Sequence, residues 1–596
     1  MKNKKLWWSI GGVACALVIV AVSLITYFVL RDKNAWNKPL TVAAAQVGET
    51  QTIKVDWAKE DSIDSVSIVV KHGDDVVYEE TITDKDEIAK NTKDVPAFFG
   101  KHQVEVTAKA NVYGKERVAK KTTTVALSAS EYNILPLVAT MPVTMISFKL
   151  DEITKNNTIP TFIYLERGWS MDYSVLPEGT ELVPVANKTT VNEFTELTEL
   201  NTITANWIKE LYEINNNSKF HLYYNDYWLY GALQATIANG IPKSNYNLVL
   251  LSDGAATFNL FNQQFNVETT EAHARYEALK TQYNTLLAEI AERGSYNRFD
   301  TSFVISADDS RKLAYVMVRE ESNVEWWVTG VDNRAIAPTN AEIFNEFKEL
   351  STEEGGNKIK IINFSNLFNS LDAEGIAYMK RLFKLGDNLF ADANAQNKQA
   401  MVILGSHDYR ASRPATNEVN FELYVRATKA YYGDKYVYYY KGHPATPADT
   451  IPEKAKELAD LGLIDLPSAI PAEMIALYNP DLVYIGYSSS TFKSTTDDQS
   501  AGVWNQTESG FTQEYKNHLE TFFSLAKNTG SKYGLTVTSD NAVLIEIADK
   551  NESGEITGVS KVAVYECTYN ADGTFESETL KFYQKNVSGT YELVTE

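Results

Sequence analysis

The chain has 596 residues, of which 44% are hydrophobic and 22% charged, and its formal net charge is −22. This length is too great for one ordinary domain and predicts three or four, each able to bury a core. The acidic balance argues against a general nucleic-acid binder, which needs a basic surface to displace counterions. It leaves room for a local pocket that binds a phosphate.

The N-terminus predicts a membrane anchor. MKNKK is followed by an apolar run from Leu6 to about Leu30, and roughly 20 apolar residues suffice to cross a bilayer. No signal-peptide cleavage site is clear, and the run continues past Cys15, which leaves a lipoprotein as a minor alternative. We therefore expect residues 1–33 to be a tail and a single transmembrane helix. Positively charged residues precede and follow the apolar run, so the sequence does not decide on which side of the membrane the rest of the chain would lie.

Cysteine and histidine usage excludes several kinds of metal site. The two cysteines are Cys15 and Cys567, so distant that neither a disulfide nor a cysteine-based metal site is expected. The seven histidines show no HxxxH or HExxH spacing, which argues against a zinc hydrolase.

Residues 38–128 are typical of an all-β domain. Short alternating runs rich in valine, isoleucine and threonine are separated by turns such as His72-Gly73-Asp74-Asp75. The runs are TQTIKVDW, SVSIVVKHG, VVYEETIT, KHQVEVTAKANVYG and KKTTTVAL. Their spacing predicts an immunoglobulin-like β-sandwich, which usually acts as a spacer or binding module.

From about residue 135 apolar strands alternate with helical stretches, which indicates parallel α/β lobes. We expect Rossmann-like lobes at 135–300 and 301–530 and a small β-rich appendage at 531–596. The first lobe has predicted strands in TFIYLERG, KFHLYYND and NLVLLSDG, and a long helix that ends at Gly294. In the second lobe the predicted strands are AYVMVREE, KIKIINF, AMVILGSHD, KYVYYYKGHP and DLVYIGYSSS.

Polar residues follow the predicted strands, where open parallel sheets bind their ligands. They are Asp253 in the first lobe, and Gly405, Ser406, Tyr409, Lys441, His443, Ser488, Ser489 and Ser490 in the second. Each cluster alone has an ordinary explanation, since Asp-Gly is a common turn and a serine run can cap a helix. Together they suit transfer from a phosphate-bearing donor to a hydroxyl, with a carboxylate as base and cationic and hydroxyl groups stabilising the departing phosphate.

Neither α/β lobe contains an Asp-x-Asp pair, because Asp84-Lys85-Asp86 falls in the β-rich region. A nucleoside-diphosphate donor held through a metal ion normally needs such a pair. We therefore expect no metal and no cofactor, and the sequence is compatible with a nucleoside-monophosphate donor.

KGHP after an aromatic strand, with a Ser-Ser pair downstream, resembles the bacterial sialyltransferases of glycosyltransferase family 80 over roughly residues 140–500. The resemblance implies a GT-B fold of two Rossmann-like lobes and CMP-sialic acid as donor. LLSDGAA occupies the place of the family's Asp-Gly motif, with Ser252 where the family has a second acid. Some members carry an N-terminal immunoglobulin-like domain, whereas the C-terminal appendage lies outside the match.

The resemblance also implies roles for individual residues. Asp253 would be the general base, and His443 would donate to the CMP phosphate and act as general acid. The implied donor-binding set, to which we add the strand-end residues Gly405 and Ser406, is completed by Lys441, Gly442, Pro444, Glu473, Ser488 and Ser489. Weaker matches to positions that contact the donor or acceptor sugar are Arg167, Asn187, Trp228 and Tyr409. With Asn225, Trp228 stands where the family has an acceptor-binding histidine.

These observations predict an inverting, metal-independent sialyltransferase whose acceptor is a glycan with a terminal galactose. Two alternatives stay open: transfer of another CMP-sugar such as Kdo, and a non-catalytic surface glycan-binding protein. An N-inside anchor would place the lobes outside the cell although CMP-sugars are made inside, so the localisation beyond a membrane anchor is undecided.

Overall fold

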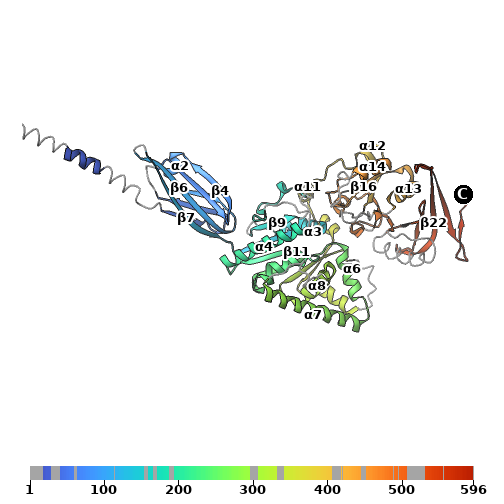
Figure 1. The fold of residues 1–596 in the computed structure, drawn as a ribbon. Coiled ribbons are helices and arrows are strands. Elements are labelled where there is room, and N and C mark those ends of the chain that lie inside the picture. The colour runs from blue at the N-terminus through green and yellow to red at the C-terminus, as the bar shows by residue number, and fades with distance from the viewer. Residues whose placement is uncertain are drawn as a thin grey trace, which may run out of the picture. The chain divides into compact units, whose positions relative to one another are not determined.

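A computed structural model describes most of the chain in two units. The described residues are 18–27, 41–58, 63–112, 115–153, 159–165, 171–186, 194–294, 306–331, 341–405, 418, 420–443, 452–487, 489–493, 495–505, 531–554 and 556–594. One unit comprises Met1–Ser130 with Asn206–Ser218, and the other Glu131–Ala205 with Lys219–Glu596 (Figure 1). Each unit is taken by itself below.

The expected N-terminal membrane anchor is contradicted. Among the described residues no helix is both long enough and apolar enough to cross a bilayer. Of the apolar run, residues 18–27 are helical, and a helix of that length spans about 15 Å, against about 30 Å of hydrocarbon. Residues 6–17 and 28–30 of the run lie outside the described residues. The membrane localisation inferred from this run is corrected accordingly.

The first unit contains two antiparallel sheets. The three-stranded sheet has β1 (Val42–Gln46), β2 (Thr52–Trp57) and β5 (Thr92–Pro96), and the four-stranded sheet has β4 (Asp75–Ile82), β3 (Ser65–His72), β6 (Gly100–Val112) and β7 (Lys115–Leu127). Alternate residues of both sheets are fully buried, among them Val55, Val66, Ile68, Val104 and Val106. This period of two is the pattern of a β-sandwich core, while the immunoglobulin-like topology stays a prediction.

Asn206–Ser218 belongs to this β-rich unit, although its position in the sequence led us to expect it in the first α/β lobe. Most of it is the second half of helix α4 (Phe194–Ile214). The buried Trp207 indole donates to the carbonyl of Phe99 at 2.7 Å, and the Ser218 hydroxyl donates to the carbonyl of Ala129 at 2.7 Å. These buried hydrogen bonds to the sandwich backbone explain the grouping.

The second unit begins with a seven-stranded sheet whose strands are all parallel. The strands are β8 (Glu131–Leu137), β9 (Thr161–Leu165), β10 (Thr180–Leu182), β11 (Lys219–Asn225), β12 (Tyr246–Leu251), β13 (Val324–Thr329) and β14 (Ile359–Ile362). Their order is β10-β9-β8-β11-β12-β13-β14. From β8 the chain adds strands in one direction as far as β10, and from β11 it adds strands in the opposite direction as far as β14. This is the doubly wound arrangement, with its switch point between β8 and β11.

A ten-stranded sheet forms the second lobe, in the order β17-β16-β15-β18-β19-β20-β21-β22-β23-β24. Its parallel part consists of β15 (Gln399–Leu404), β16 (Tyr436–Lys441), β17 (Ile464–Asp465), β18 (Val483–Tyr487), β19 (Ser500–Trp504) and β20 (Tyr533–Ser539). This part repeats the doubly wound order, with a switch point between β15 and β18. The two predicted Rossmann-like lobes are therefore confirmed by their topology.

The C-terminal strands extend the sheet of the second lobe. They are β21 (Ala542–Lys550), β22 (Ile556–Tyr569), β23 (Phe575–Lys585) and β24 (Tyr591–Leu593), and each pairs antiparallel with its neighbour. Because β20 is parallel to β19 and antiparallel to β21, the predicted appendage shares one hydrogen-bonded sheet with the lobe.

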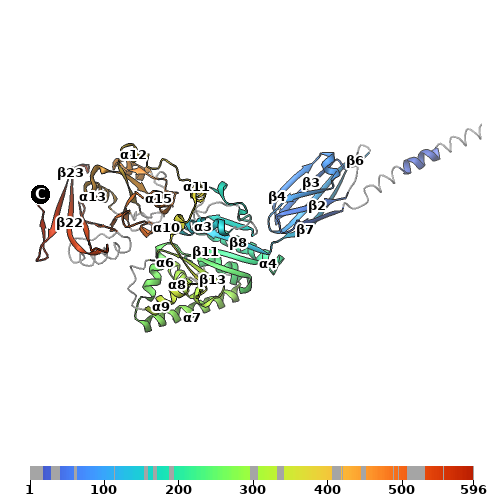
Figure 2. The same ribbon diagram turned by 180° about the vertical axis from the view of Figure 1, so that it is seen from behind.

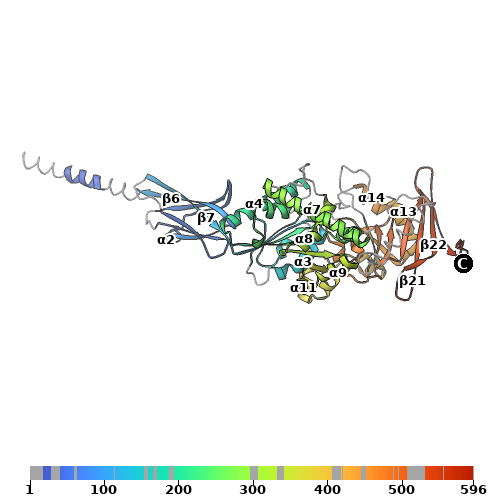
Figure 3. The same cartoon turned by 90° about the horizontal axis from the view of Figure 1, so that it is seen from below.

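Helices surround these sheets. They are α2 (Lys85–Ala89) in the first unit and, in the second, α3 (Thr140–Ile153), α5 (Leu229–Leu233), α6 (Ala255–Phe265), α7 (Thr269–Arg293), α8 (Ala307–Glu320), α9 (Ala341–Glu349), α10 (Phe364–Asn369), α11 (Ala373–Leu382), α12 (Ala391–Ala395), α13 (Phe421–Tyr432), α14 (Pro452–Asp460) and α15 (Ala472–Tyr478). Helix α7 ends at Gly294, whose φ of 62° is left-handed, as predicted. It packs on α8, which in turn packs on β13 (Figures 2 and 3).

The segment AYVMVREE, predicted as a strand, lies in helix α8. Six consecutive side chains from Leu313 to Val318 are at most 3% exposed, because α6, α7 and β13 all pack on this helix. A helix buried on every side shows no 3.6-residue period and is easily mistaken for a strand. The strands that follow it, β13 and β14, join the first sheet, so that sheet extends to residue 362 and past the expected boundary at 300.

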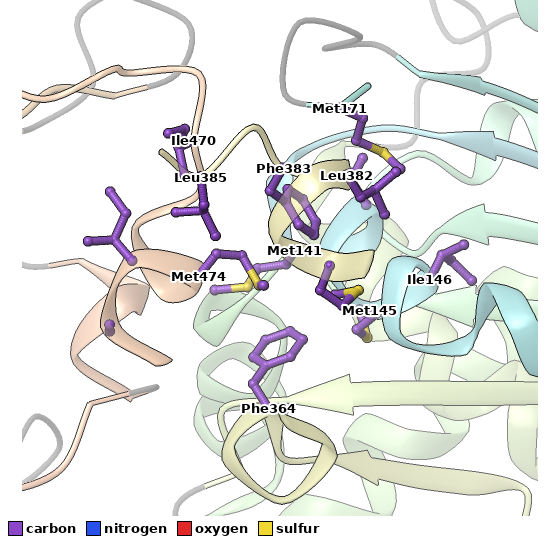
Figure 4. Packing of buried hydrophobic residues seen from close by; sticks show 14 of the residues in the cluster. Met141, Met145, Ile146, Met171, Phe364, Leu382, Phe383, Leu385, Ile470 and Met474 are labelled. Carbon is purple, nitrogen blue, oxygen red and sulfur yellow. The ribbon is translucent and has the colours of Figure 1, made fainter. Parts of the chain in front are cut away.

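A buried apolar cluster joins the two lobes of the second unit (Figure 4). Met141 and Met145 of α3 belong to the first lobe, and Met474 of α15 belongs to the second. Other members are Phe364, Leu382, Phe383, Leu385 and Ile470. Methionine is flexible and polarizable, so such a cluster can keep its contacts through small shifts of one lobe against the other.

Gly486 tests the packing of the two strands at the second switch point. Its φ is 141°, and a Cβ at this position would lie 2.3 Å from the Leu404 carbonyl oxygen in β15. We expect Gly486→Ala to destabilise the protein by about 3 kcal/mol or more, because backbone atoms cannot move aside cheaply. Denaturant unfolding measures this loss.

Gly558→Ala in β22 is the matched control, since its nearest atom would lie 3.6 Å away. Equal stability of the two variants would contradict the close approach of β15 and β18.

Candidate active site

Gly254 brings the two lobes into contact at the carboxyl ends of their strands. It follows Asp253 at the end of β12 and precedes α6, with a φ of 70°. A Cβ on Gly254 would lie 3.3 Å from Met141 Cγ and 3.4 Å from Ser490 Cβ. Ser490 begins the short 3-10 helix η8 (Ser490–Lys493), which follows β18. The structure therefore places LLSDGAA beside IGYSSSTF.

The Asp253 side chain is held by an arginine from α8. Its Oδ2 accepts a hydrogen bond from Arg311 Nη2 at 3.0 Å. The Arg311 side chain is 10% exposed and that of Asp253 is 27% exposed. Arg311 also donates from Nη1 to Asp308 at 3.1 Å, and its guanidinium lies 4.6 Å from the centre of the Tyr227 ring. The candidate base is thus fixed on one side and partly open on another.

Asp226, at the end of the adjacent strand β11, holds the backbone of Asp253. It is fully buried, and its Oδ1 accepts from the Asp253 N–H at 3.3 Å and from the Thr257 hydroxyl at 3.2 Å. Its Oδ2 accepts from the Trp326 indole at 2.9 Å. Burial raises the pKa of Asp226 to about 7, against the lowering effects of the Trp326 hydrogen bond and the Arg311 charge. Two carboxylates thus sit in different environments at adjacent strand ends, an arrangement that separates their roles.

Ser252, where the resembling family has a second acid, is fully buried. Its Oγ accepts from the Thr329 N–H at 2.9 Å and lies 3.0 Å from the Thr329 hydroxyl. The serine therefore ties β12 to β13, which fixes the strand end that carries Asp253.

In the second lobe, Glu473 and Ser489 are joined through Thr491. The Thr491 hydroxyl donates to Glu473 Oε1 at 2.9 Å, and the Ser489 hydroxyl donates to Thr491 Oγ1 at 3.1 Å. Glu473 is only 4% exposed, and burial raises its pKa against the effects of its own backbone N–H, Thr491 and Lys441. The first turn of α15 and the segment after β18 are thereby linked by buried hydrogen bonds.

Lys441 directs its ammonium into the protein. Its Nζ donates to the carbonyls of Gly442 at 2.8 Å and Ser468 at 2.9 Å, and the residue is 3% exposed. Burial lowers its pKa to about 8, while Glu473 and Asp465 act in the opposite direction. Lys441 therefore shapes the turn that leads to His443, which is partly buried.

Gly405 and Trp228 are packing positions in this structure. The Gly405 N–H donates to the Lys441 carbonyl at 3.0 Å, and a Cβ there would lie 2.5 Å from the Tyr440 hydroxyl. Gly405 thus lets β15 and β16 end side by side. Trp228 is 2% exposed and begins α5, so it offers little surface to a sugar.

Six predicted site residues lie outside the described residues: Arg167, Asn187, Ser406, Tyr409, Pro444 and Ser488. Their roles stay predictions. Within the described part of the chain, no group of three or more histidine, cysteine, aspartate or glutamate side chains could hold a metal ion.

Three residues of the site, Asp226, Arg311 and Thr491, were not predicted from the sequence. Asp226 directly follows the strand KFHLYYN, so the strand-end rule that selected Asp253 applies to it equally. Arg311 comes from a helix 58 residues further along the chain, and no local pattern announces its contact.

Several solved structures similar to this chain are sialyltransferases from Photobacterium. No family model and no curated protein matches the sequence. A sialyltransferase from Photobacterium damsela is 12% identical, with 82% of this chain and 96% of that chain covered and a TM-score of 0.47.

Two other Photobacterium structures give similar values. A 2,6-sialyltransferase solved with CMP and lactose is 12% identical, covering 82% of this chain and 92% of its own, with a TM-score of 0.48. An α/β-galactoside α-2,3-sialyltransferase from Photobacterium phosphoreum is 12% identical, covering 68% and 98%, with a TM-score of 0.47. At this identity the likeness assigns no residue roles, which rest on the geometry above.

Asp226 should make the stability of the protein depend on pH. Its pKa is about 7 when folded and about 4 in an unfolded chain. As pH rises between these values the unfolded state releases the proton first, so stability present at low pH falls, by up to about 4 kcal/mol. We expect Asp226→Asn to flatten this slope in urea unfolding measured from about pH 4.5 to about pH 7.5.

Asp540→Asn, at an exposed turn, is the control and should keep the wild-type slope. Identical slopes for wild type and Asp226→Asn would show that Asp226 is not buried as described.

Proposed function

We propose that the chain is an inverting, metal-independent sialyltransferase that moves sialic acid from CMP-sialic acid to a glycan hydroxyl, in the first place that of a terminal galactose. One observation carries the proposal. The Asp253-Gly254 turn of the first lobe meets the segment after β18 in the second lobe, where Ser489 and Glu473 are linked. A candidate base and a candidate phosphate site thus share one edge of two doubly wound sheets.

The second lobe suits the nucleotide. The buried Glu473 carboxyl stands at the first turn of α15, next to the Thr491 and Ser489 hydroxyls. On the proposal, Glu473 binds the ribose or base of CMP, while Ser488 and Ser489 donate to its phosphate. His443 follows β16, the strand next to β15 in the same parallel sheet, and donates to that phosphate from the other side of the switch point.

The reaction follows from these positions. Asp253 accepts the proton of the acceptor hydroxyl, whose oxygen attacks the anomeric carbon of sialic acid on the face opposite the phosphate. The bond between that carbon and the phosphate oxygen breaks, and CMP leaves with the electron pair. His443 and the two serines stabilise the charge that develops on the phosphate, and His443 supplies a proton. Attack opposite the leaving group inverts the anomeric configuration.

Asp253 is the residue that tests the base assignment. In an assay with CMP-sialic acid and lactose, we expect wild type to form sialyllactose in the presence of EDTA. Asp253→Asn should lower the turnover by about 10²- to 10⁴-fold, the usual contribution of a general base, and should keep CMP affinity unchanged in calorimetry. Asp540→Asn should retain wild-type turnover. Near-normal transfer by Asp253→Asn would refute the assignment.

His443 is expected to act on both donor binding and turnover. His443→Ala removes a donor to the phosphate in the ground state and in the transition state, so CMP affinity and kcat should both fall. His273→Ala is the control, because His273 lies on α7 and pairs with Glu342 at 3.2 Å. Transfer from CMP-Kdo in preference to CMP-sialic acid would change the donor, and the absence of CMP binding by wild type would favour a glycan-binding protein.

A further inference from the structure

Arg311 is a cation that the proposed reaction has not yet used. Its side chain is 10% exposed, and its Nε is buried without a hydrogen-bond partner among the described residues. Burying a guanidinium that is incompletely hydrogen-bonded costs free energy. The buried guanidinium contacts the candidate base directly, because its Nη2 donates a hydrogen bond to Asp253. Its burial is therefore linked to that contact.

Asp253 is fixed at both its ends. Asp226, from the end of β11, accepts the Asp253 backbone N–H at 3.3 Å, and Arg311, from α8, donates to the side-chain Oδ2 at 3.0 Å. Tyr227 lies under the guanidinium, 4.6 Å away. The remaining carboxylate oxygen, Oδ1, has no such partner among the hydrogen bonds of the described residues, so it can face the acceptor hydroxyl.

Two of the three elements around Asp253 carry charged side chains. Asp226 stands at the end of β11, and α8 contributes Asp308, Asp309, Arg311 and Lys312, of which Lys312 pairs with Asp309 at 3.5 Å. Helix α6 carries no titratable side chain. Among the described residues, Arg311 is the cation within ion-pair distance of Asp253. Its removal would leave that carboxylate among acidic neighbours.

We propose that Arg311 is a positioning residue that aims the Oδ1 of Asp253 at the acceptor hydroxyl, with Asp226 anchoring the Asp253 backbone. The proposal rests on the function proposed above. A base that can rotate loses alignment with the hydroxyl whose proton it accepts. Arg311 would therefore set part of the maximal rate of transfer through the orientation of Asp253.

Two variants test the alignment. For Arg311→Met we expect kcat to fall about tenfold, while CMP affinity and the KM for the acceptor stay near those of wild type. Arg311→Lys keeps the charge without the planar fork, so its kcat should also fall. In the Asp253→Asn background, Arg311→Met should cause little further loss, because Arg311 acts through Asp253.

A wild-type kcat in Arg311→Met, or an equal loss whether or not Asp253 is present, would overturn the proposal in favour of a structural ion pair. Should Arg311→Met fail to fold, Arg311→Lys decides: a wild-type kcat would show that the fork does not position the base.

The outcomes for the two proposals are distinct. The absence of sialyl transfer by wild type would sink the proposed function. A wild-type kcat in Arg311→Met and Arg311→Lys, measured in an active enzyme, would sink the Arg311 assignment alone.

Discussion

The candidate site depends on the close approach at Gly254. A side chain is disfavoured there, because the φ of Gly254 is 70° and a Cβ would lie 3.3 Å from Met141 Cγ and 3.4 Å from Ser490 Cβ. This position lies where the carboxyl ends of both parallel sheets converge, so the approach joins two sets of strand-end residues that no single lobe contains. The methionine-rich cluster beside it, with Met141 and Met474, supplies the apolar contact between the lobes. Met141 therefore belongs to the apolar interface between the lobes and also lies beside Gly254, next to the candidate base.

Buried ionisable groups around the site support more exposed ones. Asp226 is fully buried, Lys441 is 3% exposed and Glu473 is 4% exposed, and each forms hydrogen bonds to protein groups. Such groups cost stability unless they are satisfied. Asp253, at 27% exposure, is the carboxylate that a substrate could reach. A partly exposed base on a buried and satisfied support is the arrangement expected of a preorganised site.

Local patterns predicted the strands well, since each predicted strand of the α/β region except AYVMVREE is found. They also selected Asp253 and Ser489 as strand-end residues, whereas Glu473 came from the family resemblance. The patterns failed where tertiary structure decides. The run Leu313–Val318 of α8 is buried without a helical period, Arg311 reaches Asp253 from a distant helix, and β20–β24 join a sheet through pairing that no local signal encodes. Length and hydropathy alone also predicted a membrane anchor that the described helices do not provide.

The direction of the Lys441 ammonium affects how this acidic protein would stabilise a bound phosphate. The chain carries a net charge of −22, and the lysine of KGHP donates to two backbone carbonyls at 2.8 and 2.9 Å. Its charge therefore reaches a bound CMP only indirectly, through the turn that it shapes. On the proposed mechanism the direct stabilisation falls to neutral hydroxyls and to His443, which can also deliver a proton.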